Sequence, residues 1–371
     1  MKLPLIKPVL RIACLVVSII IYILTILSAY GGRFTTEIFT FPAILTLALP
    51  WFALATALIA IAWFACRRIF AGALGVLAIL ASWGPVSTVS PFGYSRKPTP
   101  GAQTFTIMTY NMIHGWNQTS EKADSNLTIE YILDTDADIV CLQEAVTMAP
   151  GGDIPDFTES QFARLKAKYP YIAGDPSLDT KVLSKYPAVF EKGYNYIEGP
   201  YDERRYTFYK LKINGRPLTV INVHLTSFML NAKEREVVTE INSIETARRS
   251  YGEMKDSIRN KLSSGFKKRK HDVEILRETI DHMKGAMIIC GDFNDVPESY
   301  AYRLLRGEDL RDAYVETGFG PLVTFNQHAF WFHLDQVLYR GPLRALNVRK
   351  GKTKLSDHYP LIAEFEFTDQ K

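Results

Sequence analysis

The first part of the chain alternates between long apolar stretches and short charged ones. Residues 8–32 carry a single charge, Arg11, whereas residues 38–66 and 69–94 carry none. A helix needs about 20 mostly apolar residues to cross the hydrocarbon core of a bilayer. The pattern therefore predicts three membrane spans, near residues 12–30, 42–65 and 69–86.

A cleaved signal peptide followed by a buried helical hairpin is the alternative interpretation. The first apolar stretch is longer than the roughly 7–15 apolar residues of a signal peptide, and two more stretches follow it. We therefore assign residues 1–88 to a transmembrane region with about three helices. The third stretch is the shortest and contains glycine, so an interfacial or re-entrant segment is its alternative.

The basic residues near the span ends predict the orientation. Lys and Arg precede the first span and recur at Arg67 and Arg68, whereas the first loop holds Arg33 beside Glu37. Positive charge favours the cytoplasmic side, so three spans place the rest of the chain on the extracytoplasmic or periplasmic side of a cell or inner membrane. If the third stretch does not cross, the rest of the chain is cytoplasmic.

A linker and a soluble domain follow. Residues 85–103 contain four prolines and no helical period, which is typical of a linker. We place the linker at 89–103 and the soluble domain at 104–371. The domain is rich in Lys, Arg, Asp and Glu, but the net charge of +4 for the whole chain does not by itself imply a nucleic-acid partner.

Short strands and helices alternate along the soluble domain. Thr104–Met112 alternates apolar and polar residues as a strand does, and Asn214-Gly215 between two such runs predicts a hairpin. Further strands are expected at 137–145, 180–190 (broken by Pro187), 287–290, 333–341 and 361–367, and helices at 125–135, 158–168 and, as two or three helices, 229–284. This mixture predicts an α+β fold of two sheets packed face to face with helices outside.

Polar side chains stand next to the apolar runs that predict strands. Asn111, Glu144, His224, Asp292 and Asn294 follow such a run, Asp335 lies inside FHLDQVL, and Asp357 and His358 precede YPLIAEF. Strands that run side by side bring their ends to one edge, so these groups can converge on one cleft. Mg²⁺ takes oxygen ligands and keeps several waters, so one or two carboxylates suffice to bind it. The set therefore indicates a site for a hard cation and a phosphate.

Each residue also has a structural interpretation. Asn111 can cap a turn, Glu144 can be a solvated loop acid, and His224 can belong to the core. Asp292 with Asn294 can form an Asx-turn. The four cysteines show no C-x-x-C spacing, so we expect buried thiols without disulfides and no structural zinc.

Six motifs resemble the endonuclease/exonuclease/phosphatase superfamily of deoxyribonuclease I-like, metal-dependent phosphoesterases. They are TYNMIHG, DIVCLQE, NVHL, CGDFND, LDQVL and LSDHYPL, in the order of that superfamily and spread over about residues 104–368. The resemblance implies a four-layer α/β/β/α sandwich. It also implies a phosphodiesterase or phosphatase that uses Mg²⁺ or Mn²⁺.

The resemblance implies a role for each residue. Glu144 is expected to hold the metal with Asn111 and Asp357 as further ligands or water anchors. The other roles are as follows: Asp292 orients or deprotonates the attacking water, Asn294 contacts a phosphate oxygen, His224 contacts the phosphate and protonates the leaving group, and His358, oriented by Asp335, stabilises the transition state or acts as acid and base.

Other residues receive weaker assignments. Arg204 and Arg205 are candidate phosphate contacts. His114 either shapes a turn or joins the site, and for His333 we favour a structural role over a place in the cleft. The run Lys267–Lys270 is a solvated helix face, a lipid-headgroup patch or a nucleic-acid contact. We expect the remaining histidines to be solvated: His271, His282 and His328.

The substrate class stays open at this stage. The Trp-Thr-Asp-Arg stretch of inositol 5-phosphatases is replaced by FHLDQVL, which lowers the weight of inositol phosphates. A domain held at a bilayer meets lipid headgroups at high effective concentration, so phospholipid or sphingolipid headgroups are expected, with the helical insert 229–284 flanking the cleft. An extracytoplasmic endonuclease or exonuclease on DNA or RNA is the alternative. An inactive membrane-anchored binding module predicts a missing catalytic residue, and none is missing.

Overall fold

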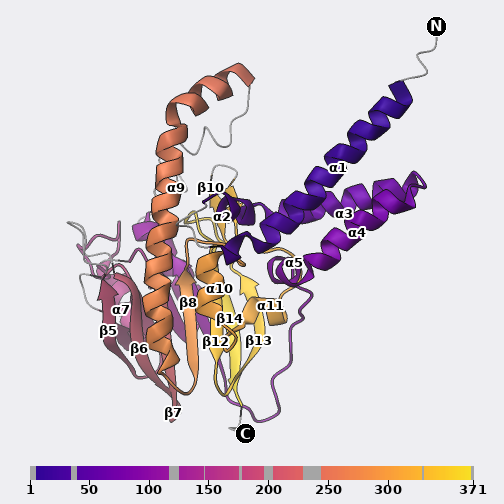
Figure 1. The fold of residues 1–371 in the computed structure, drawn as a ribbon. Helices are drawn as coiled ribbons and strands as arrows, with labels where there is room; N and C mark the ends of the chain where they lie inside the picture. The colour runs from indigo at the N-terminus through magenta and orange to yellow at the C-terminus, as the bar shows by residue number, and fades with distance from the viewer. Residues whose placement is uncertain are drawn as a thin grey trace.

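A layered body of strands and helices carries a group of apolar helices on one side (Figure 1). The computed structural model describes residues 6–34, 40–116, 125–145, 147–174, 178–195, 204–228, 244–327 and 330–368. The N-terminus lies at the far end of the apolar helices, and the C-terminus lies at the opposite end of the layered body (Figure 1).

One N-terminal helix is long and apolar enough to cross a membrane. The spanning segment runs from Pro8 to Arg33 and covers most of α1 (Ile6–Tyr30) and all of the short helix η1 (Gly31–Arg33). The next two expected spans are bent. α2 (Thr40–Leu47) meets α3 (Leu49–Ala65) at 67°, and α4 (Ile69–Ala81) meets α5 (Trp83–Val89) at 71°.

Each of the spans expected at 42–65 and 69–86 is thus a bent pair of helices, and the chain has up to three spans if each bent pair forms one. Both breaks precede a proline, Pro50 and Pro85, within the first turn of the next helix. Proline has no N–H to donate and is tolerated only in that first turn. α5 also extends a helix into residues that had been assigned to the linker.

The apolar helices pack directly on the layered body. η1 contacts α10 (Tyr300–Arg306), α2 contacts α9 (Ile244–Asp281), and α5 contacts α11 (Ala313–Thr317). A Cβ atom on Gly32 would lie 1.9 Å from the backbone oxygen of Glu298. Phe92, just beyond α5, forms a β-bridge with Phe319. The two parts of the chain are therefore closely packed, with backbone touching backbone.

Two six-stranded sheets form the centre of the body. The first has the order β13-β14-β1-β2-β4-β3, and its strands are β1 (Thr104–Asn111), β2 (Ile139–Gln143), β3 (Tyr171–Ala173), β4 (Lys181–Ser184), β13 (Leu343–Lys350) and β14 (Leu361–Phe367). The second has the order β5-β6-β7-β8-β12-β9, and its strands are β5 (Ala188–Asn195), β6 (Arg204–Ile213), β7 (Arg216–His224), β8 (Met287–Asp292), β9 (Arg311–Asp312) and β12 (Asp335–Arg340). A separate hairpin joins β10 (Phe325–Gln327) to β11 (Phe330–Phe332).

Three apolar clusters hold the layers together. One lies between the sheets and includes Ile107, Cys141, Val220, Ile288 and Val337. Helices α6 (Leu127–Thr135) and α7 (Glu159–Lys168) cover the outer face of the first sheet, and α9 and α10 cover the outer face of the second. The predicted four-layer α/β/β/α sandwich is therefore confirmed.

Local sequence signals account for two changes of direction. Asn214 and Gly215 both have positive φ, 44° and 91°, as the predicted tight hairpin between β6 and β7 requires. Pro187 separates β4 from β5, and these two strands lie in different sheets. The single broken strand expected at 180–190 is thus two strands, and the proline marks the crossing from one sheet to the other.

The charged segment before β8 is one long helix over its described part, where two or three helices had been expected. α9 places Val273, Leu276 and Ile280 in the core beneath the second sheet. Of the basic run, Lys267 and Lys268 are exposed, but Arg269 is fully buried. Its Nε donates to Asp295 over 3.1 Å, and its Nη1 donates to the backbone oxygen of Thr226 over 2.7 Å.

Arg269→Met tests this buried pair. Removing the guanidinium leaves the buried Asp295 carboxylate without its countercharge, which costs about 3–5 kcal/mol in similar pairs. We expect the urea midpoint of the full-length protein in detergent to fall. The double variant Arg269→Met/Asp295→Leu should recover much of that loss, and a single variant as stable as the wild type would contradict the assignment.

Gly291→Ala tests the close approach of β8 to β7. Gly291 has φ 143°, and a Cβ atom there would lie 1.9 Å from the backbone oxygen of Val223. We expect a loss of about 2 kcal/mol or more in unfolding free energy. The control is Gly84→Ala, where nothing lies within 4 Å and a change within about 1 kcal/mol is expected from helix propensity.

Candidate active site

Strand pairing brings the predicted polar residues to one edge of the sandwich. β1 and β2 are parallel and end together at Asn111 and Gln143, one residue before Glu144. β7 and β8 are also parallel, with His224 opposite Asp292. Asp335 begins β12 opposite Asp292 in an antiparallel pair. The convergence that the sequence predicted follows from this register.

Asn111 connects the two sheets. Its Nδ2 donates to Glu144 Oε1 over 3.0 Å and to Asp292 Oδ2 over 3.1 Å. The side chain is 1% exposed, and its Oδ1 accepts from the backbone N–H of Ile113. Asn111 therefore holds one carboxylate from each sheet in a fixed position.

His358 forms a buried pair with Asp335. Nδ1 of His358 lies 2.8 Å from Asp335 Oδ2, and Nε2 lies 3.5 Å from Asp292 Oδ2. Burial alone lowers the pKa of His358, but the two carboxylates outweigh it and raise this pKa to about 10. The imidazole is therefore cationic at neutral pH, as the predicted Asp335–His358 pairing requires.

His224 is oriented by Asp179, a residue that the sequence interpretation missed. Nδ1 of His224 lies 2.6 Å from Asp179 Oδ2, and Nε2 lies 3.7 Å from Glu144 Oε1. Burial opposes the charged form, but Asp179 and Glu144 raise the pKa of His224 to about 9. Asp179 precedes β4 by two residues, so its position before an apolar strand was the available signal.

Asp292 and Asn294 form the turn after β8. The backbone N–H of Asn294 donates to Asp292 Oδ1 over 2.7 Å, and Asn294 Nδ2 donates to the backbone oxygen of Leu225. Burial raises the pKa of Asp292, and the nearby His358 and His224 oppose that rise. Asp295, one residue further along, pairs with the buried Arg269.

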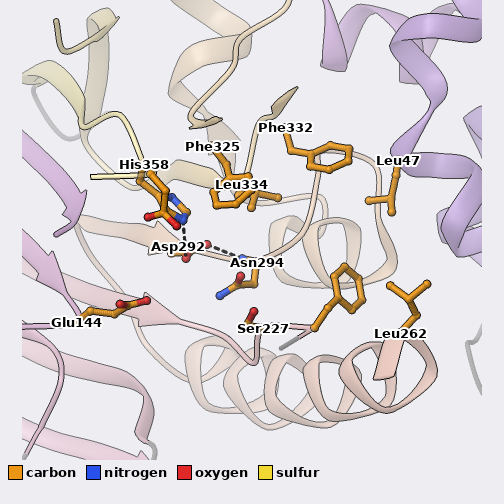
Figure 2. Close-up of a pocket in the computed structure, with 12 residues that line it drawn as sticks. Leu47, Glu144, Ser227, Leu262, Asp292, Asn294, Phe325, Phe332, Leu334 and His358 are labelled. Atoms are coloured by element: carbon orange, nitrogen blue, oxygen red, sulfur yellow. Dashed lines mark hydrogen bonds and ion pairs between the residues drawn. The ribbon is translucent and has the colours of Figure 1, made fainter. Parts of the chain in front are cut away.

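Five of the eight predicted groups line a cavity of about 170 Å³, whereas Asn111, His224 and Asp335 lie outside its lining. Glu144, Asp292 and His358 lie on one side of it (Figure 2). Leu47, Leu262 and Phe332 lie on the opposite side (Figure 2). Asp357 and Asn294 also line the cavity. Half of the residues that line the cavity are thus polar, three of them carboxylates, and half are apolar.

The donor set fits a hard divalent cation. Glu144 is a partly exposed carboxylate with Asn111 beside it, and Asp357 lines the same cavity. Mg²⁺ and Mn²⁺ favour such oxygen ligands. Among the described residues, Asp292, Asp335 and His358 also place ligand atoms within 4.8 Å of one another. In that group the cationic His358 already supplies positive charge between the two carboxylates.

The structure locates two of the residues that received weaker assignments, His114 and His333, but not the side chains of Arg204 and Arg205. His114 Nε2 lies 3.6 Å from Glu144 Oε2, so it borders the polar group. His333 is buried against Tyr314 and lies outside the lining of this cavity. Arg204 and Arg205 begin β6, but their side chains are outside the described residues.

The remaining histidines agree with expectation wherever they are described, and the cysteines agree in part. His271 and His282 are exposed, and His328 lies outside the described residues. All four cysteines are free thiols; Cys141 and Cys290 are buried as expected, but Cys14 and Cys66 are exposed.

Comparison with known proteins identifies the fold family. Truncated Caenorhabditis elegans TDP2 is 17% identical (TM-score 0.45; 71% of this chain and 98% of that chain covered). D. rerio TDP2 complexed with a single-strand DNA product is 15% identical, with a TM-score of 0.47 and coverage of 71% of this chain and 99% of that chain. Sphingomyelinase C from Streptomyces griseocarneus is 16% identical, with a TM-score of 0.42 and coverage of 71% of this chain and 99% of that chain. None of the curated proteins matches the sequence. The model of the Endonuclease/Exonuclease/phosphatase family matches residues 108–358, and the chain therefore belongs to that family.

Proposed function

We propose that the protein is a membrane-anchored, divalent-metal-dependent hydrolase of phosphate esters that acts on lipid headgroups. The observation that carries this proposal is the buried Asp292 carboxylate, which lies between two imidazoles that each have their own carboxylate partner. Phosphoryl transfer depends on positioning and on neutralising charge. The paired imidazoles and carboxylates supply fixed positions and positive charge on one side of the cavity.

Water is the nucleophile in the proposed reaction. Asp292 accepts a hydrogen bond from the water and takes its proton as the oxygen attacks phosphorus. The new P–O bond forms while the bond to the leaving alkoxide breaks, and the alkoxide receives a proton from His224. Asp179 stabilises the protonated form of His224, because its Oδ2 lies 2.6 Å from Nδ1 of the imidazole.

His358 and Asn294 hold the phosphate in this scheme. The cationic His358, backed by Asp335, offsets the negative charge on the phosphoryl oxygens. Glu144, with Asn111 and Asp357 nearby, would hold the metal ion. Mg²⁺ bound there would polarise a phosphoryl oxygen and lower the pKa of a bound water.

The membrane assignment combines helix length with charge distribution. The Pro8–Arg33 helix is of spanning length, and Lys and Arg concentrate before it and at Arg67–Arg68. We therefore place the catalytic domain on the extracytoplasmic side. Leu47, from the N-terminal helices, reaches the catalytic cavity, which supports a substrate that resides in the bilayer.

Asp292→Asn should abolish most of the activity. The amide keeps the shape of the carboxylate but cannot accept the proton from water, so we expect about a 10²–10⁴-fold loss of kcat. The assay is hydrolysis of bis(p-nitrophenyl) phosphate by the full-length protein in detergent with Mg²⁺. Asp134→Asn, an exposed residue on α6, is the matched control and should retain wild-type rates. Full activity in Asp292→Asn would refute the mechanism.

Metal dependence is tested separately. Treatment with EDTA should remove activity, and Mg²⁺ or Mn²⁺ should restore it. Glu144→Gln loses the anionic ligand, so the Mg²⁺ concentration at half-maximal activity should rise by about tenfold or more. The exposed Glu308→Gln serves as control. An enzyme that stays fully active after complete metal removal would overturn the metal assignment.

A further inference from the structure

A second cavity lies where the N-terminal helices meet the catalytic domain. It has a volume of about 430 Å³, within the roughly 300–1,000 Å³ typical of ligand sites. Trp51, Leu54 and Trp83 line it from the helices, and Leu322, Trp331 and Phe332 line it from the catalytic domain. Most of its lining is apolar, and neither part of the chain forms it alone.

The second cavity adjoins the catalytic cavity. Leu47, at the end of α2, and Phe332, at the end of β11, line both. In Figure 2 these two side chains stand on the side of the catalytic cavity that lies away from Glu144 and His358. A molecule that passes between them would place one end beside Asp292 and the other among the apolar helices.

The lining has features of a surface made for hydrocarbon. Trp51, Trp83 and Trp331 are each about half exposed, at 53%, 49% and 51%. Exposed aromatic residues concentrated at one place mark a binding surface more often than a solvated one, and tryptophan favours the boundary between a bilayer and water. Trp51 and Trp331 approach to 6.4 Å between ring centroids across the junction.

One buried polar atom also lacks a partner here. His333 lines the second cavity and is 8% exposed, and its Nε2 has no hydrogen-bond partner among the described residues. Buried polar atoms in folded proteins are nearly always hydrogen-bonded. An ester or hydroxyl group of a bound molecule would supply the missing hydrogen bond.

We propose that this second cavity binds a hydrocarbon chain of a phospholipid whose phosphate lies in the catalytic cavity. The N-terminal helices then form half of the substrate site as well as the anchor. This proposal rests on the proposed function, because the chain leads to the phosphate that is cut. It also accounts for the apolar half of the catalytic cavity, which a phosphate alone does not need.

The first test is chain length. Full-length protein in detergent is assayed with alkyl p-nitrophenyl phosphates from ethyl to octyl, all below their micellar concentration. Each methylene that enters the cavity should raise kcat/KM by up to about fourfold, or ~0.8 kcal/mol. A wild-type enzyme that hydrolyses every ester at the same kcat/KM would overturn the chain site and leave the proposed hydrolase intact.

The second test fills the cavity. Ala57 lines it from α3, and Ala57→Phe should lower kcat/KM for the octyl ester by at least about tenfold while the ethyl ester is cut at the wild-type rate. Ala65→Phe, exposed at the end of the same helix, should behave as wild type on both. Activity on the ethyl ester shows that the variant is folded. Equal rates for Ala57→Phe and wild type on the octyl ester count against the proposal.

The third test does not depend on catalysis. Phosphatidylglycerol with a diazirine on one acyl chain is incorporated into phosphatidylcholine nanodiscs with the full-length protein and photolysed. Peptides that contain Trp51–Leu54 and Leu322–Trp331 should be labelled, and Ala57→Phe should reduce that label but not label elsewhere on α1. Absence of label from both peptides overturns the proposal, even if the protein hydrolyses no ester at all.

Discussion

The site depends on the interactions that stabilise the buried Asp292 carboxylate. This carboxylate is 1% exposed, and a buried charge is costly unless other groups compensate it. Asn111, His358 and His224 approach it at 3.1, 3.5 and 4.0 Å, and they come from both sheets and from the loop before β14. The carboxylate is therefore stabilised only while the sheets remain packed in this register. The same packing that makes the fold stable also assembles the chemistry, so disturbing one should disturb the other.

The imidazoles of His358 and His224 have the same kind of partner but lie at different positions in the site. Each has a carboxylate on Nδ1, Asp335 for His358 and Asp179 for His224, and in each case acidic neighbours raise the pKa well above that of a free histidine. Both rings are therefore cationic at neutral pH and face an anionic centre. That arrangement suits a substrate that carries negative charge and gains more of it on the way to the transition state.

The strand ends were predictable because an apolar run followed at once by a carboxylate or imidazole is rare inside a buried sheet and common at its edge. Asn111, Glu144, His224 and Asp292 were located in this way, whereas Asp335 and His358 stand before the apolar part of their strands, β12 and β14. Asp179 was not found, since a single acid in a loop before a short strand resembles any solvated acid. Arg269 was misjudged because it directly follows two exposed lysines, Lys267 and Lys268. Its burial depends on the side of α9 to which it points and on the presence of Asp295 opposite it. The bends in the apolar helices fall next to Pro50 and Pro85, and hydropathy alone does not register the effect of these prolines on the helix.

The contact of Gly32 with the backbone of Glu298 has a mechanical consequence. A catalytic domain on a flexible tether can rotate and meet molecules throughout a hemisphere above the bilayer. Backbone packed on backbone, reinforced by the Phe92–Phe319 bridge, prevents that rotation. The depth and tilt of the catalytic cavity relative to the Pro8–Arg33 helix are then fixed. If the substrate is a lipid, as proposed, encounter with it is a search in two dimensions, in which lateral diffusion and surface density set the rate and bulk concentration does not.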